Sequence, residues 1–189
     1  MSILVTDIVA SLRTRLNDAD GGAYTDAEIR SALLQALQDT EMATRSNLTV
    51  ETADTVAQQA QYTFNQFELL EVTYEGVPLT KRTLPDLIAQ GYTSDIPLGT
   101  PSAYAVVSGG TITLSPVPVG IGELKVFGYS TTSSLGSSIT TVPASVVAQV
   151  VTNRAEMILR MWRPTVSGNV EIASALGQIL QSFLRVVTR

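Results

Sequence analysis

The sequence contains neither cysteine nor histidine in its 189 residues. Without cysteine there is no disulfide and no thiol nucleophile, and without histidine there is no imidazole base. An ordinary zinc site, which is built from these two residue types, is excluded as well. Any catalysis would therefore depend on carboxylate, lysine or serine side chains, and no recognised catalytic grouping of them occurs.

Charged residues are scarce. They make up 15% of the chain, whereas about one quarter is usual for a soluble domain. Hydrophobic residues make up 44%, and the mean hydropathy is +0.21. We therefore expect some apolar surface to be buried against other subunits. With only two lysines, Lys81 and Lys125, and a net charge of −5, a phosphate-neutralising basic face is not expected.

Long apolar runs are also missing. No stretch approaches the roughly 20 apolar residues that a membrane-spanning helix needs. Residues 1–16 lack a basic start and place Asp7 where the apolar part of a signal peptide would lie. We expect a soluble protein that is not exported through a cleaved signal and does not contact a membrane.

Helical periodicity is present near both ends of the chain. An apolar stripe predicts a helix over residues 3–16. Thr25 and Glu28 have the spacing of a capping box, which predicts the start of a second helix. A third helix is expected to end before Pro164, and a fourth stripe covers residues 172–187.

The middle of the chain, from about residue 48 to 131, has the pattern of strands and turns. Alternating side chains predict a hairpin that turns at residues 75–76 and another that turns at residues 108–110. A further strand is expected over residues 123–129, and a short helix over residues 84–90.

These elements predict an α+β fold, a helical bundle of four main helices with an inserted antiparallel β module. Residues 1–46 and 142–189 would form the bundle, and residues 47–141 the β-rich module. Neither pair of helices has enough partners to cover its own apolar stripe. We therefore expect the two pairs to pack together.

The stretch NDADGGAYTDAE at residues 17–28 could be a metal loop or a corner between two helices. If Asp18 is taken as the first position of a calcium loop, Asp20 falls at the third. Ile29 then stands at the twelfth, where a calcium loop has a bidentate glutamate. We therefore interpret the stretch as a helical corner in which Asp18 accepts bonds from local amides. No metal site and no cofactor is predicted.

Arg154 lies near the apolar stripe of the third helix. The favoured interpretation is that its aliphatic part lies along the edge of the stripe and its charged end reaches water. The alternative is an ion pair with a neighbouring helix or subunit, in which Asp39 or Glu41 would be the partner.

Three stretches in a fixed order carry a resemblance to a known family. They are Leu16-Asn17-Asp18 followed by a glycine-containing loop and by residues 24–29, then residues 99–104 leading to residues 111–118, and finally a helix after Val142-Pro143 followed by a last helix rich in alanine and leucine. This order resembles the head-to-tail adaptor proteins of tailed bacteriophages. The chain departs from the family's usual pattern at Tyr24, where tryptophan is common, and at residues 36–38, where an asparagine is often found.

The resemblance implies a structural virion protein of the neck region and not an enzyme. Such proteins form a ring, usually twelvefold, beneath the portal protein, continue the DNA channel and offer a platform to tail or nozzle proteins. DNA would pass through the ring without specific binding, and a neutral or acidic channel wall suits this role. The family implies no cofactor and no catalytic residue, and assembly in the host cytoplasm.

The last helix carries apolar side chains on more than one narrow stripe. We expect its end to contact the portal protein or a neighbouring subunit, through Phe183, Leu184, Val186, Val187 and Arg189. The resemblance also implies docking on the portal through the C-terminal segment. The alternative is that the helical bundle buries the whole broad face.

Two other functions stay open at this point. Another phage neck or tail component, such as a tail terminator or a fibre attachment module, would also be acidic, cysteine-free and partly β. A small carboxylate-dependent hydrolase is the third possibility, although most acidic residues fall in caps, turns and helix faces.

Overall fold

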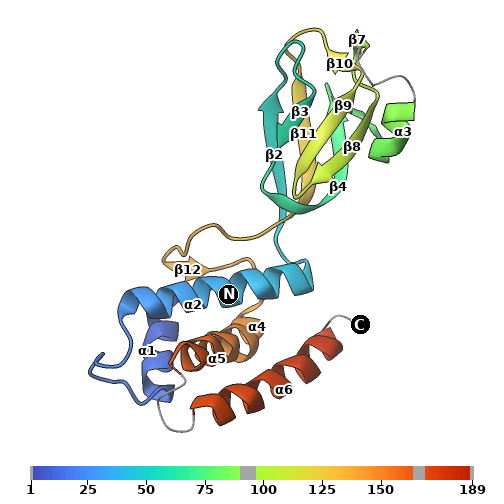
Figure 1. Cartoon of the computed structure of the whole chain (residues 1–189). Helices are drawn as coiled ribbons and strands as arrows, with labels where there is room; N and C mark the ends of the chain where they lie inside the picture. The colour runs from blue at the N-terminus through green and yellow to red at the C-terminus, as the bar shows by residue number, and fades with distance from the viewer. Residues whose placement is uncertain (1, 90–96, 164–168, 188–189) are drawn as a thin grey trace. The chain divides into compact units, whose positions relative to one another are not determined.

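The computed structural model describes residues 2–89, 97–163 and 169–187, without the side chains of residues 179–180 and 182–187. The chain forms two compact units (Figure 1). The helical unit comprises Met1–Asn47 and Thr132–Arg189, and the β unit comprises Leu48–Thr131.

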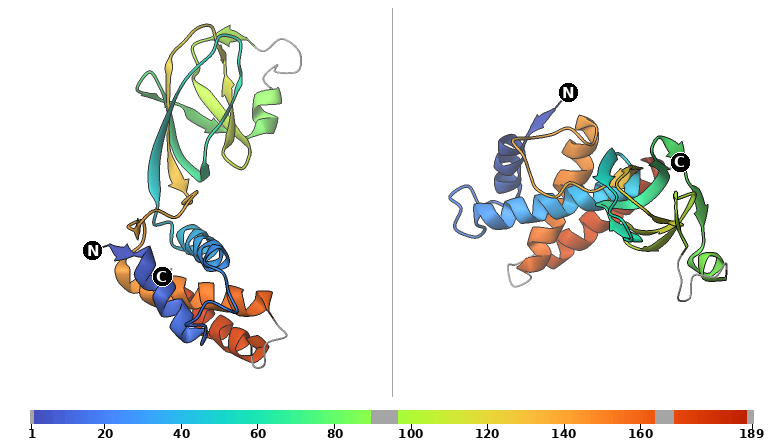
Figure 2. Two further views of the ribbon diagram at one scale, coloured as in Figure 1. Left: turned by 90° about the vertical axis from the view of Figure 1, so that its left-hand side faces the viewer. Right: turned by 90° about the horizontal axis from the view of Figure 1, so that it is seen from above.

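The helical unit is built around a long helix that begins after Pro143. Its segments are α4 (Ala144–Val146), the π-helical η1 (Val147–Val151) and α5 (Thr152–Trp162). Around it lie α1 (Val5–Arg15), α2 (Asp26–Thr44) and α6 (Asn169–Val187), and α5 contacts all three (Figures 1 and 2). The short strands β1 (Ile3–Leu4) and β12 (Ser138–Ile139) pair antiparallel.

The start of α2 is fixed by the capping box that the sequence predicts. The Thr25 hydroxyl accepts a hydrogen bond from the Glu28 amide at 3.2 Å, and the Glu28 carboxylate accepts one from the Thr25 amide at 2.8 Å. Two amides that the first turn would leave unpaired are thereby bonded. The prediction of a helix start at Thr25 is confirmed.

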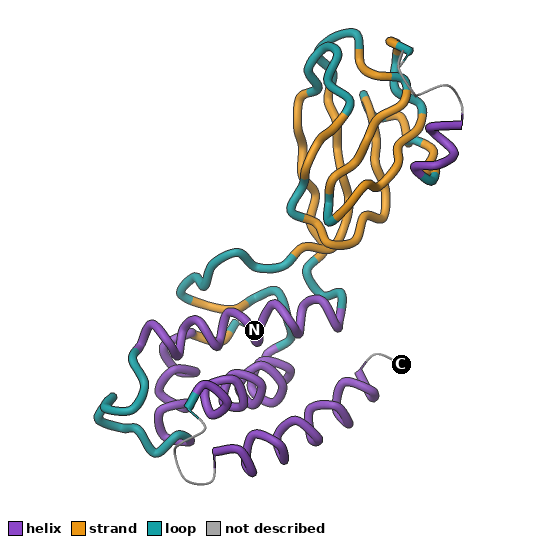
Figure 3. Tube along the Cα trace, viewed as in Figure 1, coloured by secondary structure: helices purple, strands orange, loops and turns teal. Residues whose placement is uncertain are grey.

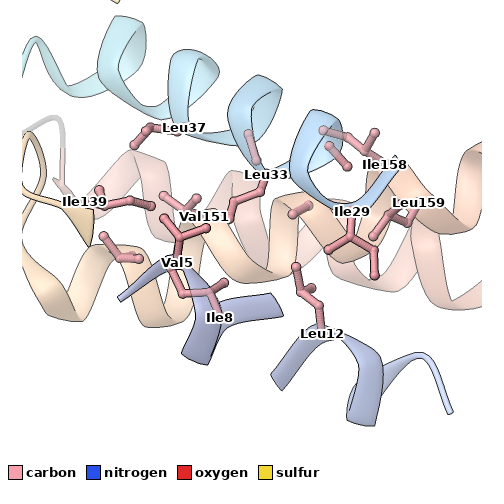
Figure 4. Close-up of a cluster of buried hydrophobic side chains, with 14 of the residues drawn as sticks. Val5, Ile8, Leu12, Ile29, Leu33, Leu37, Ile139, Val151, Ile158 and Leu159 are labelled. Carbon is pink, nitrogen blue, oxygen red and sulfur yellow. The ribbon is translucent and has the colours of Figure 1, made fainter. Parts of the chain in front are cut away.

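One apolar core joins α1, α2 and α5 (Figure 4). Each helix contributes its periodic stripe, which includes Leu12 from α1, Leu33 from α2 and Leu159 from α5, all fully buried. Ile139 of β12 closes one side of this core. Burying side chains of this size stabilises the fold by about 1.5–3 kcal/mol each relative to exposure.

The predicted bundle of four main helices is wrong. None of the α6 side chains that the structure describes belongs to the core shared by α1, α2 and α5, because α6 packs mainly on α5. Its buried Ala173 belongs to a separate small cluster with Val150 and Met157. The reason is side-chain size: the α6 positions that meet α5 include Ala173 and Gly177, which bury little apolar area.

The β unit contains two four-stranded sheets (Figure 3). The strand order of the first is β2 (Leu48–Asp54), β11 (Glu123–Ser130), β4 (Gln66–Tyr74) and β5 (Val77–Pro78). The order of the second is β3 (Gln61–Thr63), β9 (Thr111–Ser115), β8 (Ala103–Ser108) and β6 (Thr80–Arg82). Outside them lie the pair β7 (Leu98–Gly99) and β10 (Val117–Pro118), and the short helix α3 (Leu84–Ala89).

The inner faces of the two sheets form a second apolar core. Leu124 and Val126 from the first sheet and Ile112 and Leu114 from the second are fully buried in it. The predicted hairpins are confirmed, β4 with β5 and β8 with β9. Gly110 is required at the second turn, because its φ is +81° and an added Cβ would lie 2.3 Å from a backbone oxygen.

The prediction of a purely antiparallel β module is also wrong. β6 runs parallel to β8, and β7 runs parallel to β10. The chain leaves the first sheet at Leu79, whose amide still bonds to Val72 of β4, and enters the second sheet with Thr80. This crossing from one sheet to the other sets the direction of β6, and alternation within a single strand carries no information about it.

Candidate interaction surfaces

The acidic stretch after α1 folds as the predicted corner. Asp18 is buried, and its two carboxylate oxygens accept hydrogen bonds from the Ala23 amide at 2.8 Å and the Tyr24 amide at 3.0 Å. The Arg13 guanidinium adds a third bond at 3.1 Å. These interactions, the Ala23 bond first, hold the pKa of Asp18 below its ordinary value. Both oxygens thus serve to close the corner between α1 and α2.

A buried polar cluster fixes the beginning of α6. The Arg160 guanidinium donates to Asn169 Oδ1 at 2.9 Å, to Glu156 Oε1 at 3.0 Å and to the carbonyl of Arg15 at 2.9 Å. The side-chain Nδ2 of Asn169 in turn donates to the carbonyl of Arg163 at 2.8 Å. Because buried polar groups are costly when unpaired, this cluster ties the start of α6 to α5 and to the end of α1.

Arg154 forms an ion pair with Asp39 at 2.9 Å, which links α5 to α2. The favoured interpretation of an unpaired snorkelling arginine is therefore wrong, and the alternative with Asp39 is confirmed. Glu41 has a different role. It is fully buried, and its carboxylate accepts hydrogen bonds from the amide and the hydroxyl of Thr132, each at 2.7 Å.

An open apolar groove of about 810 Å³ lies between α2, α5 and α6. Its lining includes Met42, Met157 and Met161, and the Asp39–Arg154 pair lies at its side. Small residues on α6 allow that helix to lie close to α5 and leave this space beside α2. Methionine is adaptable and common at binding surfaces. No motif marked this site in the sequence, because its residues come from three separate helices.

The β unit exposes apolar side chains on the outer face of its first sheet. Leu48 and Val50 of β2 are more than half exposed, and Phe67 is stacked on Tyr129 with ring centroids 6.5 Å apart. Contiguous apolar surface of this kind is typical of proteins that bind other proteins.

The predicted contact residues Phe183, Leu184, Val186 and Val187 belong to the last turns of α6. The backbone of α6 is described as far as Val187, whereas these side chains and the whole of Arg189 lie outside the described residues. The predicted contact of the C-terminal segment therefore remains a prediction.

The polar side chains that the structure brings together hold helices and corners, whereas the groove and the exposed face of the first sheet are lined largely by apolar side chains. Within the described ranges, three or more metal-ligating side chains do not gather in one place, and none of the helices is long and apolar enough to cross a membrane. The groove between α2, α5 and α6 and the exposed face of the first sheet are the two candidate protein-binding surfaces of the described residues.

The sequence profile of the SU10 adaptor protein family matches residues 3–183. The chain belongs to this family, which is a family of phage head-to-tail adaptors. The comparison with curated proteins gave no match. The resemblance inferred from the order of the sequence stretches is thus confirmed, and the family is structural.

Proposed function

We propose that this adaptor assembles as a ring beneath the phage portal protein, continues the DNA channel and presents a platform to tail or nozzle proteins. Membership of the adaptor family over residues 3–183 carries the proposal. It favours an adaptor over a tail terminator, a fibre attachment module or a hydrolase. The family resemblance implies twelve copies in the ring, no catalytic step and assembly in the host cytoplasm.

The distribution of charge supports a role beside DNA that does not grip it. The helical unit contains nine basic and nine acidic residues, so the net charge of −5 falls on the β unit. In sequence the β unit has three basic residues, Lys81, Arg82 and Lys125, and eight acidic ones, Glu51, Asp54, Glu68, Glu71, Glu75, Asp86, Asp95 and Glu123. Such a surface repels phosphates and lets DNA slide past.

The C-terminal end of α6 is proposed to dock on the portal or on a neighbouring subunit. The cluster around Asn169 holds the beginning of α6 from within the helical unit. The C-terminal end of α6 can then contribute to binding, because it is not needed to hold the beginning of the helix in place. Deletion of residues 183–189 is expected to leave the circular dichroism spectrum and the cooperative melting intact and to abolish binding to portal-bearing capsids.

Electron microscopy tests the proposed ring directly. Purified protein is mixed with capsids that carry the portal but lack the neck, and a ring of added density is expected at the portal vertex. Capsids without portal serve as the control. A mixture in which neither bound protein nor added density is found would refute the function. If the truncated protein binds normally, only the C-terminal docking is refuted.

A further inference from the structure

The strand β2 has an open edge of the kind that pairs with another chain. It is the first strand of its sheet, and it is bonded only to β11 among the described strands. Its seven residues, Leu48–Asp54, pair with β11 in unbroken register, and they include neither proline nor lysine. Proteins commonly protect edge strands with bulges, prolines or lysines, and β2 has none of these.

The register shows which backbone groups face the open edge. The Thr55 amide donates to the carbonyl of Gly122 at 2.8 Å. Because the backbone groups of successive residues point to opposite sides of a strand, every second residue of β2 counted back from Thr55 is bonded to β11. The amides and carbonyls of Val50 and Thr52 then point away from the sheet. These groups offer a row of donors and acceptors to a neighbouring molecule.

The opposite edge of the β unit has different chemistry. It is formed by β5 and β6, which end the first and the second sheet and are joined through Leu79. β6 carries Lys81 and Arg82, and all three of its residues are exposed. The third cation of the unit, Lys125, forms an ion pair with Glu123 on its own strand. The two remaining cations of the unit are therefore concentrated on one edge.

The β2 edge is acidic, whereas the β6 edge is basic. Asp54 of β2 is exposed, whereas the carboxylate of Glu51 accepts hydrogen bonds from the Asn65 amide at 3.2 Å, and β2 contains no cation. Two β units that each carry a charge of −5 repel one another unless their contact brings opposite charges together. A contact between the β2 edge and the β6 edge meets this condition, whereas a contact between two β2 edges does not.

We infer that the β2 edge of one copy packs against the β5–β6 edge of the next copy, with Asp54 facing Lys81 and Arg82. This inference rests on the ring proposed above. Because the two edges are different surfaces, the contact is head-to-tail, and such contacts close into a ring when the rotation between copies allows it. β6 is short, so the charge pairs, more than a long backbone ladder, set the partner and the register.

Cross-linking tests the geometry, and the absence of native cysteine makes the experiment specific. Thr52→Cys and Thr80→Cys place one thiol on each edge, at exposed positions. In capsid–adaptor complexes, a short bis-maleimide is expected to link the double variant into a ladder of dimers, trimers and larger species. The single variants, each with one thiol, are the controls and should stay monomeric. Dimers formed by Thr52→Cys alone would overturn the inference, because they require two β2 edges to meet.

Charge reversal tests the pairing. Asp54→Lys and Lys81→Glu are each expected to cause a loss of incorporation into the complexes, and the combined variant should recover it. Glu171→Lys, an exposed reversal on α6 in the helical unit, is the matched control and should incorporate normally. Equal incorporation of all variants would refute the charge pairing. If microscopy finds a ring of the wild-type protein but neither cross-links nor effects of charge reversal are seen, this inference is refuted and the proposed function stands. If microscopy finds no ring, the proposed function is refuted.

Discussion

Arg160 Nη1 donates a hydrogen bond to Asn169 Oδ1 at 2.9 Å, and both side chains are buried. The bond joins α5 to the first residue of α6. This bond matters because the described side chains of α6 lie outside the core that α1, α2 and α5 share. The position of α6 therefore depends on a few specific polar contacts as well as on apolar burial.

Replacing Asn169 with alanine is expected to lower the free energy of unfolding by about 1–3 kcal/mol, because Arg160 and the Arg163 carbonyl lose a buried partner. Urea denaturation followed by circular dichroism measures the effect. Gln178→Ala, at an exposed position of the same helix, is the control and should change the stability by less than about 0.5 kcal/mol. Equal stability of the two variants would show that the cluster does not anchor α6.

The ion pair between Arg154 and Asp39 is expected to contribute little. Their side chains are 38% and 33% exposed, so water screens the attraction. A double-mutant cycle with alanine at both positions should give a coupling energy below about 1 kcal/mol that decreases as salt is added. A larger coupling that does not respond to salt would indicate that the pair is buried in solution.

Asp18 and Asp20 are expected to differ strongly although they are two residues apart. Asp18→Asn should cost about 1.5–3 kcal/mol, because the buried carboxylate accepts two amide bonds and one from Arg13. Asp20 is exposed, so Asp20→Asn should change the stability by no more than about 0.5 kcal/mol. Thermal melting compares the two. Calcium should not shift the melting temperature of either variant or of the parent, and a shift in the parent alone would favour an ion site.

Acid is expected to weaken the start of α2. Hydrogen bonds from the Thr25 amide and hydroxyl, and then from Arg163, lower the pKa of Glu28 from 4.5 to about 2. A carboxylate with a lowered pKa in the folded state stabilises the fold above the unfolded value, and this contribution is lost as the pH falls from 4.5 towards 2.

The comparison of parent and Glu28→Gln checks this pH dependence. The parent should melt at a higher temperature near neutral pH, and the difference should shrink as the pH falls through the range between 4.5 and 2. A difference that is constant across this range would mean that the Glu28 carboxylate does not stabilise the fold through its charge.

The helical unit is expected to fold without the β unit. Leu48 and Tyr129 are paired in adjacent strands, so the two points where the chain enters and leaves the β unit are close together. Replacement of residues 48–131 by a short glycine–serine linker should therefore leave a cooperative melt and a helical circular dichroism spectrum. Within the helical unit, Thr132 would still bond to Glu41 and Gln38. A random-coil spectrum would contradict the prediction.

The sequence by itself determined the features that depend on neighbouring residues. The capping box at Thr25, the corner closed by Asp18 and the hairpin at residues 75–76 each form within a few positions of the chain, so their signals are local. The order of such signals was also sufficient to indicate the adaptor family.

Only the tertiary structure decided which faces meet. The apolar periodicity of the sequence indicates which side of α6 is buried. It does not predict that Ala173 packs on α5, outside the main core, or that a groove opens beside α2. It does not select Asp39 over Glu41 as the partner of Arg154. The physical reason is that these contacts depend on side-chain volumes and directions on elements far apart in the sequence, and a pattern within one element does not contain them.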